Sequence, residues 1–194
     1  MKKHLFLTAP AGSGKSACIR GALGAQLLCA GGFVTEHQWD GEGRLLRSSL
    51  LPTAATGGAE GFSPLPYLDL SAPTPRHDNE VFRGEGVKLL REAAYYPFAV
   101  LDAIGGFELL IPQFREALAD LLSSDVPLLG VLYTQQESVE LCRRLGLGER
   151  AELSVGQLWK ALRADPDPQI ERCAGLTRRL AQRSVEDWVR EYAR

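Results

Sequence analysis

The stretch L-F-L-T-A-P-A-G-S-G-K-S-A-C-I-R, residues 5–20, sets the frame for the whole chain. It begins as a short apolar run, passes through a loop of small residues and continues into a helical pattern. Ile19, Leu23 and Leu27 recur at the spacing of one helix face, and Gly31 and Gly32 close the segment. The loop itself reads A-x-x-x-x-G-K-S, which predicts a phosphate-binding loop, or P-loop, between a strand and a helix.

The residue types of this loop suit phosphate binding. Gly12 and Gly14 let the backbone curl so that successive N–H groups converge on phosphate oxygens. The helix that opens at Gly14 adds its positive dipole end. Lys15 can reach the β- and γ-phosphates, and the Ser16 hydroxyl can ligate Mg²⁺. We therefore expect the nucleotide-binding residues to be Ala11, Gly12, Ser13, Gly14, Lys15, Ser16 and Ala17.

Ala9 occupies the place of the first glycine in the usual P-loop pattern. Alanine tolerates most loop conformations but not a positive φ. The substitution is therefore a mild departure that is compatible with nucleotide binding.

Composition indicates an ordinary soluble globule. The 194 residues are 45% hydrophobic and 24% charged, and the formal net charge is −2. That balance argues against a dominant electrostatic surface for nucleic acid or an anionic membrane. One α/β domain spanning residues 1–194 is the expectation for this length.

The cysteines and the N-terminus bear on location. Cys18, Cys29, Cys142 and Cys173 are scattered without the spacing of a metal site, which favours reduced, packed thiols. The apolar run after Lys2 and Lys3 is too short for a signal peptide and leads directly into the P-loop. No segment approaches transmembrane length. We expect a cytoplasmic protein.

Alternating patterns along the chain predict a mainly parallel sheet with helices on both faces. Expected strands cover residues 4–8, 33–36, 44–51, 98–101, 126–133 and 151–155. Expected helices cover residues 15–30, 79–96, 114–122 and 138–145, and a helical C-terminal region covers residues 156–194. In that region Asp167-Pro168 has the form of one helix start and Ser184 that of another, while Asn79 is the expected cap of the second helix.

Residues 52–79 form the least regular part of the sequence. They are rich in Pro, Gly, Ala and Ser, apart from the apolar run at residues 67–70. A long irregular segment in a compact domain is usually functional or mobile.

A second nucleotide-binding element is predicted at Asp102. The apolar run Phe98–Leu101 precedes it and has the form of a buried Walker B strand. The Walker B carboxylate holds the Mg²⁺ shell while the P-loop hydroxyl holds the ion from the other side. The pair Ser16 and Asp102 is therefore the expected magnesium site.

These motifs resemble a family of small nucleoside-triphosphatases, the cancer-related and thermophilic enzymes with a RecA-like fold. Its landmarks are the P-loop, then G-F-x-T-E, then an apolar strand with D-E-I-G-x-x-E-L, then a helix start of the form P-x-F-R. They correspond here to residues 32–36, 102–109 and 112–115, and residues 79–82 are similar to the start of the preceding helix. The resemblance covers residues 2–155 and implies a P-loop NTPase fold that binds nucleoside triphosphates.

One departure from this family is chemical. The family has glutamate directly after the Walker B aspartate, where it would orient or activate the attacking water, and this chain has Ala103. A methyl group cannot accept a proton. Glu36 and Glu108 match family positions and each could supply a substitute carboxylate, although a capping or turn role explains them equally well.

Two further groups of residues have simple readings. Arg76 lies in the irregular segment, where it could reach the γ-phosphate as an arginine finger, although a solvated loop arginine is the simpler interpretation. His4, His37 and His77 share no ligand spacing, so a histidine metal site is not indicated.

We therefore expect a Mg²⁺-dependent protein that binds ATP or GTP and hydrolyses it slowly to the diphosphate. One alternative is a non-catalytic nucleotide switch that presents a surface to another protein, which Ala103 favours. A second is a small-molecule or nucleoside kinase, because P-loops serve both reactions, but no Arg-rich lid is evident. Neither nucleic acid nor membrane is an expected partner.

Overall fold

A single eight-stranded sheet runs through the molecule, with the order β5-β4-β3-β2-β6-β7-β1-β8. A computed structural model describes residues 2–57, 62–164 and 168–193. The strands are β1 (His4–Thr8), β2 (Gly31–Trp39), β3 (Leu45–Pro52), β4 (Leu65–Asp69), β5 (Arg76–His77), β6 (Ala99–Ile104), β7 (Leu128–Leu132) and β8 (Pro168–Arg172).

The half of the sheet that contains β1 is parallel. Strands β2, β6, β7, β1 and β8 pair in parallel, while β3, β4 and β5 extend the β2 edge in antiparallel fashion. The predicted α/β architecture with a mainly parallel sheet is confirmed. The strands predicted at residues 33–36 and 44–51 pair with each other as the antiparallel hairpin of β2 and β3.

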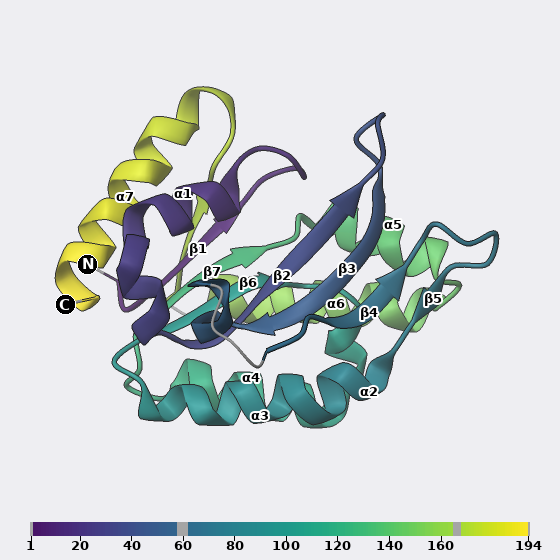
Figure 1. Ribbon diagram of the computed structural model, residues 1–194, viewed down its shortest axis with the longest axis horizontal. Coiled ribbons are helices and arrows are strands. Elements are labelled where there is room, and N and C mark those ends of the chain that lie inside the picture. Colours follow the sequence, from purple (N-terminus) through teal and green to yellow (C-terminus); the bar gives the residue numbers. More distant parts are fainter. Residues whose placement is uncertain (1, 58–61, 165–167, 194) are drawn as a thin grey trace.

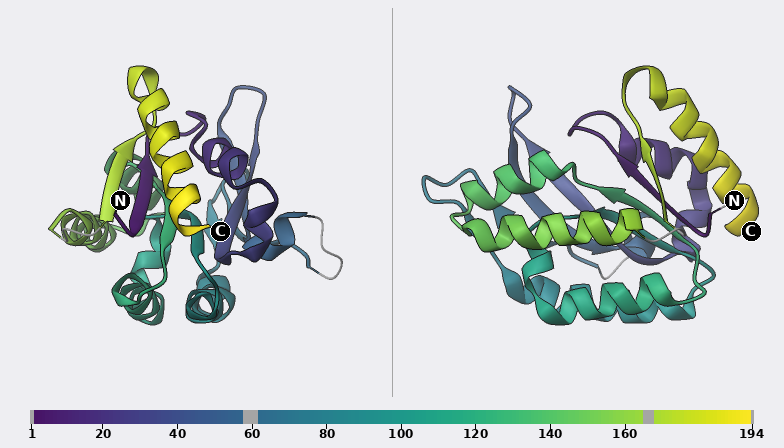
Figure 2. Two further views of the ribbon diagram at one scale, coloured as in Figure 1. Left: turned by 90° about the vertical axis from the view of Figure 1, so that its left-hand side faces the viewer. Right: turned by 180° about the vertical axis from the view of Figure 1, so that it is seen from behind.

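Helices cover both faces of the sheet (Figures 1 and 2). Helices α1 and α7 lie on one face, and α3, α4 and α6 pack on the other. Their bounds are α1 (Lys15–Leu23), α2 (Asn79–Val81), α3 (Val87–Glu92), α4 (Pro112–Ser123), α5 (Gln135–Arg144), α6 (Glu149–Ala164) and α7 (Arg178–Tyr192). Short 3₁₀ segments are η1 (Gly24–Cys29), η2 (Thr53–Gly57), η4 (Ala93–Tyr95), η5 (Phe107–Leu110) and η6 (Gly175–Thr177), and η3 (Phe82–Gly86) is a π-helical turn.

Two apolar cores follow from the alternation of side chains along the strands. In β1, Leu5 and Leu7 pack under α1 and α7, while Phe6 packs toward α3 and α4 on the opposite face. Trp188 of α7 is fully buried in the first of these cores, beside Phe98. The apolar face of the last helix therefore packs against the sheet.

The segment predicted to be irregular, residues 52–79, supplies two strands of the sheet. Pro66 lies within β4, where the pairing with β3 shifts register between Ser48 and Ser49. Proline is tolerated at such irregularities because the missing N–H breaks no regular ladder. Because proline within a run of residues normally argues against a strand, Pro66 also explains why β4 was not predicted from the sequence. The helix that follows is capped by Asp78, whose carboxylate accepts a hydrogen bond from the Glu80 N–H at 2.8 Å, and not by Asn79.

Residues 151–155 were expected to form a strand and instead belong to α6. Ala151, Leu153 and Val155 alternate as in a strand, but Leu153 is 68% exposed. Ala151 and Val155 are buried at a spacing of four, and Trp159 continues the same face. Residues 151–155 alone fit both strand alternation and helical spacing. The helical spacing continues to Trp159, beyond those five residues, and this identifies the segment as a helix.

The C-terminal region also differs from its prediction as purely helical. Pro168 begins strand β8, which pairs with β1, rather than a helix; Asp167 lies outside the described residues. Proline is compatible with the first residue of a strand. Ser184 is in the middle of α7, not at its cap, and its hydroxyl donates to the Glu171 carboxylate at 2.6 Å.

Gly32 permits the close approach of β2 to β6. Its φ is +92°, and a Cβ there would lie 2.3 Å from the carbonyl oxygen of Val100. We expect Gly32→Ala to lower the free energy of unfolding by about 2 kcal/mol or more, since a strained φ costs about 1–3 kcal/mol before any clash is counted. Denaturant unfolding measures this loss.

Gly41→Ala is the matched control, because a Cβ at Gly41 would meet no atom within 4 Å. Its unfolding free energy should stay within about 0.5 kcal/mol of the wild type. Equal stability of the two variants would contradict the role of Gly32.

Candidate nucleotide site

The predicted P-loop joins β1 to α1 at the carboxyl end of the parallel sheet. Gly12 and Gly14 adopt positive φ values of 74° and 88°, as their role in the loop predicted. Ala9 is 1% exposed and packs in the core, and no non-glycine residue of the described chain has a positive φ. The loop therefore accommodates alanine at its first position without strain.

Lys15 lies in the first turn of α1 and is largely buried. Its ammonium donates hydrogen bonds to the carbonyl oxygens of Ala9 at 2.5 Å and Pro10 at 3.1 Å. Burial lowers the pKa of the Lys15 ammonium, while the carboxylates of Glu137 and Asp102 raise it. The cation thus sits on two carbonyl oxygens at the N-terminal end of the loop, where the charges of two acidic side chains stabilise it.

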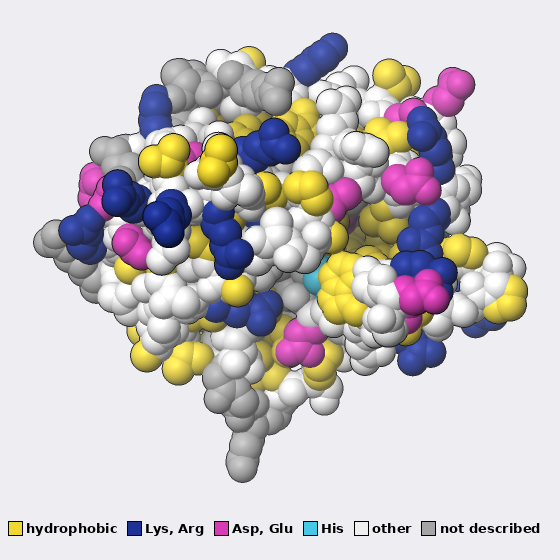
Figure 3. Space-filling model, turned by 90° about the horizontal axis from the view of Figure 1, so that it is seen from above, with side chains coloured by type: hydrophobic (Ala, Val, Ile, Leu, Met, Phe, Trp, Pro, Cys, Tyr) yellow, Lys and Arg dark blue, Asp and Glu magenta, His cyan; other side chains and the backbone are white. Residues whose placement is uncertain are grey.

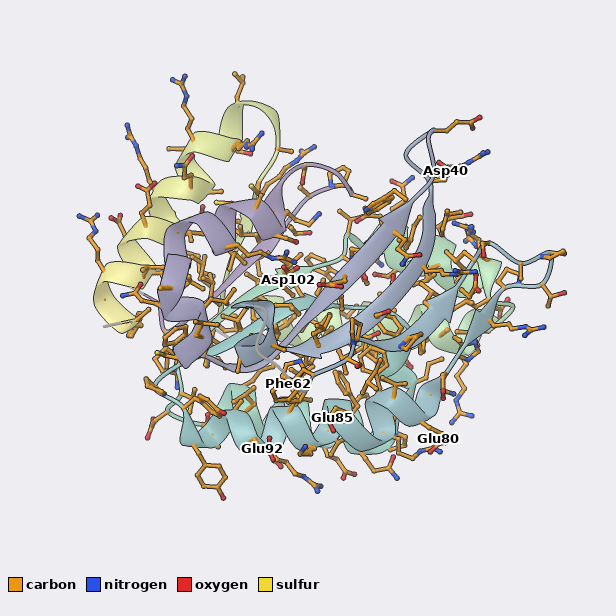
Figure 4. All side chains as sticks on the ribbon, in the orientation of Figure 1. Asp40, Phe62, Glu80, Glu85, Glu92 and Asp102 are labelled. Atoms are coloured by element: carbon orange, nitrogen blue, oxygen red, sulfur yellow. The ribbon has the colours of Figure 1, made fainter. Side chains whose placement is uncertain are left out.

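Ser16 and Asp102 lie together, as predicted. The Ser16 hydroxyl donates to Asp102 Oδ1 at 2.8 Å, and Arg20 Nη2 lies 3.8 Å from Oδ2. Figure 4 shows Asp102 near the middle of the molecule. The residue is 2% exposed, and within the described chain its Oδ2 is buried without a hydrogen-bond partner.

Electrostatics make Asp102 a strong acceptor for a cation. Burial raises the pKa of its carboxyl, and the Ser16 hydrogen bond and the charges of Arg20 and Lys15 oppose that rise. An oxygen pair of one carboxylate and one hydroxyl is the type of protein ligand that Mg²⁺ takes when substrate phosphates complete its shell. Within the described residues no cluster of three or more His, Cys, Asp or Glu side chains could hold a metal ion by itself.

A cavity of about 1110 Å³ opens over this pair, at the carboxyl ends of β1, β2, β6 and β7. Figure 3 shows the molecule from this side, with a hollow near its centre and both acidic and basic side chains around it. All the predicted P-loop residues line it except Ser13. In open α/β sheets, ligands bind outside the carboxyl ends of the strands.

Of the other predicted site residues, some line the cavity and others do not. Glu36, an exposed residue of β2, and Ala103 both line the cavity with Asp102. Arg76 does not: it is exposed on β5, at the far edge of the sheet from β1. The structure therefore does not bring Arg76 to the site.

Glu108 lies outside the cavity and is 3% exposed. Its Oε1 accepts hydrogen bonds from the N–H groups of Gly105 and Gly106 at 2.6 and 2.7 Å. Burial raises the pKa of the Glu108 carboxyl, against the effect of these backbone hydrogen bonds. Its role in the structure is to hold the turn that follows β6.

Several polar side chains of the cavity were missed by the sequence analysis, among them Glu137, Arg20 and His37. Glu137 accepts a hydrogen bond from the Ala11 N–H at 2.5 Å, Arg20 approaches Asp102, and His37 lines the wall formed by β2. The pattern T-x-x-E at residues 134–137 is readable as a helix capping box, but only the fold places it against the P-loop.

The comparisons with known proteins agree with this geometry. Residues 4–157 match the family described as NTPase. The crystal structure of THEP1 from the hyperthermophile Aquifex aeolicus superposes with a TM-score of 0.63 at 15% sequence identity, covering 98% of this chain and 99% of that chain. The solution structure of a human cancer-related nucleoside triphosphatase superposes with a TM-score of 0.61 at 18% identity, covering 97% of each chain.

At these identities the two superpositions establish a shared P-loop NTPase fold. No curated protein matches the chain in sequence. Of the helices within the described ranges, none combines the length and the apolar composition that a membrane crossing requires.

His37 makes the stability of the fold depend on pH. Its ring hydrogen-bonds to Ser48 at 2.8 Å, and burial, followed by the charges of Arg20 and Lys15, lowers its pKa from 6.5 to about 4. Between those two values the unfolded chain binds a proton at His37 and the folded chain does not. The free energy of unfolding should therefore fall as the pH drops from 6.5 to about 4.

We expect His37→Gln to lack this part of the pH dependence, since glutamine does not titrate and can still hydrogen-bond to Ser48. Urea unfolding of both proteins across this pH range measures it. Parallel pH profiles for the two proteins would show that His37 does not titrate as its surroundings require.

Proposed function

Because this chain belongs to the NTPase family, we propose that it is a Mg²⁺-dependent nucleoside-triphosphatase that hydrolyses ATP or GTP slowly to the diphosphate. The observation that carries this proposal is the contact of Ser16 with Asp102 beneath the P-loop. It joins the two elements on which phosphoryl transfer depends, a phosphate cradle and a carboxylate for the metal. Nucleotide binding and hydrolysis in general are the properties of the family.

The residues present fit a magnesium ion. Ser16 and Asp102 would hold it, and the buried Oδ2 of Asp102, which has no hydrogen-bond partner in the described chain, supports this role. When bound, the ion would neutralise charge on the β- and γ-phosphates. The P-loop N–H groups and Lys15 would bind and orient the phosphates beside it.

Slow turnover follows from the side chain after Asp102. Ala103 lines the cavity but has only a methyl group, so it cannot orient or deprotonate water. The same feature supports the second candidate, a nucleotide switch that binds a triphosphate without cleaving it. The four cysteines are free thiols, which supports the cytoplasmic location that is part of this proposal.

Phosphate release from each of the four common ribonucleoside triphosphates tests hydrolysis. If no other side chain takes the role of the missing glutamate, we expect turnover with ATP or GTP on the order of 10⁻⁴ s⁻¹, as in unassisted small GTPases, and a substitute carboxylate would raise it. Binding of a triphosphate with no phosphate release from any of the four would favour the switch.

Lys15→Ala should weaken triphosphate binding by about 10–150-fold, because hydrogen bonds to a charged group contribute about 1.5–3 kcal/mol. Calorimetry with a non-hydrolysable analogue measures the affinity. Lys88→Ala, on the exposed side of α3, is the control and should bind as the wild type does. Unchanged affinity in Lys15→Ala would mean that the loop does not bind phosphate.

Asp102→Asn should weaken binding in Mg²⁺ and have much less effect in EDTA, since the carboxylate acts through the ion. The exposed Asp120→Asn on α4 controls for the loss of one negative charge. An equal loss of affinity with and without Mg²⁺ would assign Asp102 a purely structural role.

A further inference from the structure

Glu137, in the first turn of α5, accepts a hydrogen bond from the P-loop backbone. Its Oε1 accepts the hydrogen bond from the Ala11 N–H at 2.5 Å. The helix follows β7, the strand that lies between β6, which carries Asp102, and β1, which leads into the P-loop. A carboxylate therefore reaches the nucleotide site from an element that does not belong to either nucleotide motif.

The contact lies at the end of the loop where the γ-phosphate would be bound. Lys15, the residue that reaches β- and γ-phosphates, has its ammonium on the carbonyl oxygens of Ala9 and Pro10. Ala11 is the next residue of the loop. The negative charge of Glu137 also stabilises the Lys15 ammonium. Of the charges that raise the pKa of Lys15, that of Glu137 has the largest effect.

The Glu137 side chain is held in one orientation and can still accept one more hydrogen bond. Its Oε2 accepts from the Thr134 N–H at 2.9 Å and from the Thr134 hydroxyl at 2.8 Å. A carboxylate has about four acceptor sites. Three are used by hydrogen bonds within the described chain, which leaves one on Oε1, the oxygen that contacts the P-loop.

The other acidic side chains near the site are placed differently. Asp102 is engaged by Ser16, and Glu108 is buried in a turn outside the cavity. Glu36 lines the cavity from β2, which β6 and β7 separate from β1, and Glu140 lines it from α5, three residues after Glu137. The carboxylate with a bond to the loop itself is that of Glu137.

We propose that Glu137 is the catalytic carboxylate that orients and deprotonates the attacking water, the role that Ala103 cannot fill. This inference rests on the proposed triphosphatase function. The water oxygen forms a bond to the γ-phosphorus as the bond from that phosphorus to the β,γ-bridging oxygen breaks. The diphosphate leaves with the electron pair, and the water proton passes to the free acceptor site of Glu137 Oε1.

Glu137→Gln tests this role with little disturbance of the fold. Glutamine has one carbonyl oxygen, which can accept from the cap residue as in other capping boxes, so α5 should keep its N-terminus while the hydrogen bond from the Ala11 N–H is lost. A positioned general base typically contributes about 10²–10⁴-fold, so kcat should fall at least about tenfold. The Kd of a non-hydrolysable triphosphate analogue should be unchanged or lower, because a negative charge beside the γ-phosphate has been removed.

Glu92→Gln is the matched control, the same chemical change on the exposed side of α3, far from Asp102 in Figure 4. It should keep the wild-type kcat and Kd. Thermal unfolding of both variants checks the fold. Glu137→Asp provides a second test, since a side chain shorter by one methylene keeps the charge but loses its reach, and a displacement of about 1 Å can cost about 10²-fold in rate.

Three outcomes would overturn the role of Glu137. Turnover of Glu137→Gln or Glu137→Asp equal to that of Glu92→Gln would do so while leaving the triphosphatase function intact. Tighter binding with undiminished kcat would make Glu137 a competitor of the phosphates for the loop. A wild-type protein that binds triphosphates and hydrolyses none would overturn the proposed function, and this role with it.

Discussion

The hydrogen bond between the Ser16 hydroxyl and the Asp102 carboxylate joins the first turn of α1 to β6, although β7 separates that strand from β1. The parallel sheet makes the contact possible. Thr8 at the end of β1 is level with Leu132, and Asp102 is level with Val131, so the loop after β1 opens over the carboxylate. The cavity, the cation beside it and the acidic side chain of the neighbouring helix all depend on this register.

The same arrangement places charges where they are costly. Asp102 and Lys15 are both largely buried, and burial shifts the pKa of each toward its neutral form. Their mutual attraction and the loop carbonyls offset part of that cost, since a buried charge is tolerated only when it is paired and hydrogen-bonded. A buried oxygen without a partner is a poor contribution to stability and a good ligand for a cation. Sites of this kind are expected where function, rather than stability, has selected the residues.

A carboxylate at the reacting end of the site need not come from the strand that carries the metal ligand. Glu137 lies in a helix cap, and the hydrogen bonds that stabilise the cap also direct its remaining acceptor site toward the P-loop. Local helix stability and the geometry of the site thus use the same side chain. Function in P-loop proteins is accordingly argued from the position of groups in space, because the same fold supports different chemistries.

Short sequence patterns predicted the structure correctly where a residue type meets a single physical requirement, such as glycine at a positive φ or apolar residues in a buried strand. The glycines of the P-loop, the strand from His4 to Thr8 and the buried strand that carries Asp102 follow from backbone freedom and burial, and the structure contains each of them. Alternating apolar residues at 151–155 were misleading, because five residues fit a strand and a helix equally well until Trp159 decides the period.

Strand order, the pairing of β8 with β1 and the positions of Glu137 and Arg76 were decided by the tertiary structure alone. Each depends on contacts between residues far apart in the chain. Glu137 meets Ala11 across more than a hundred residues, a contact that no local pattern encodes. A few neighbouring residues therefore determine the chemistry of the phosphate loop, whereas the packing of the whole sheet determines which side chains surround that loop.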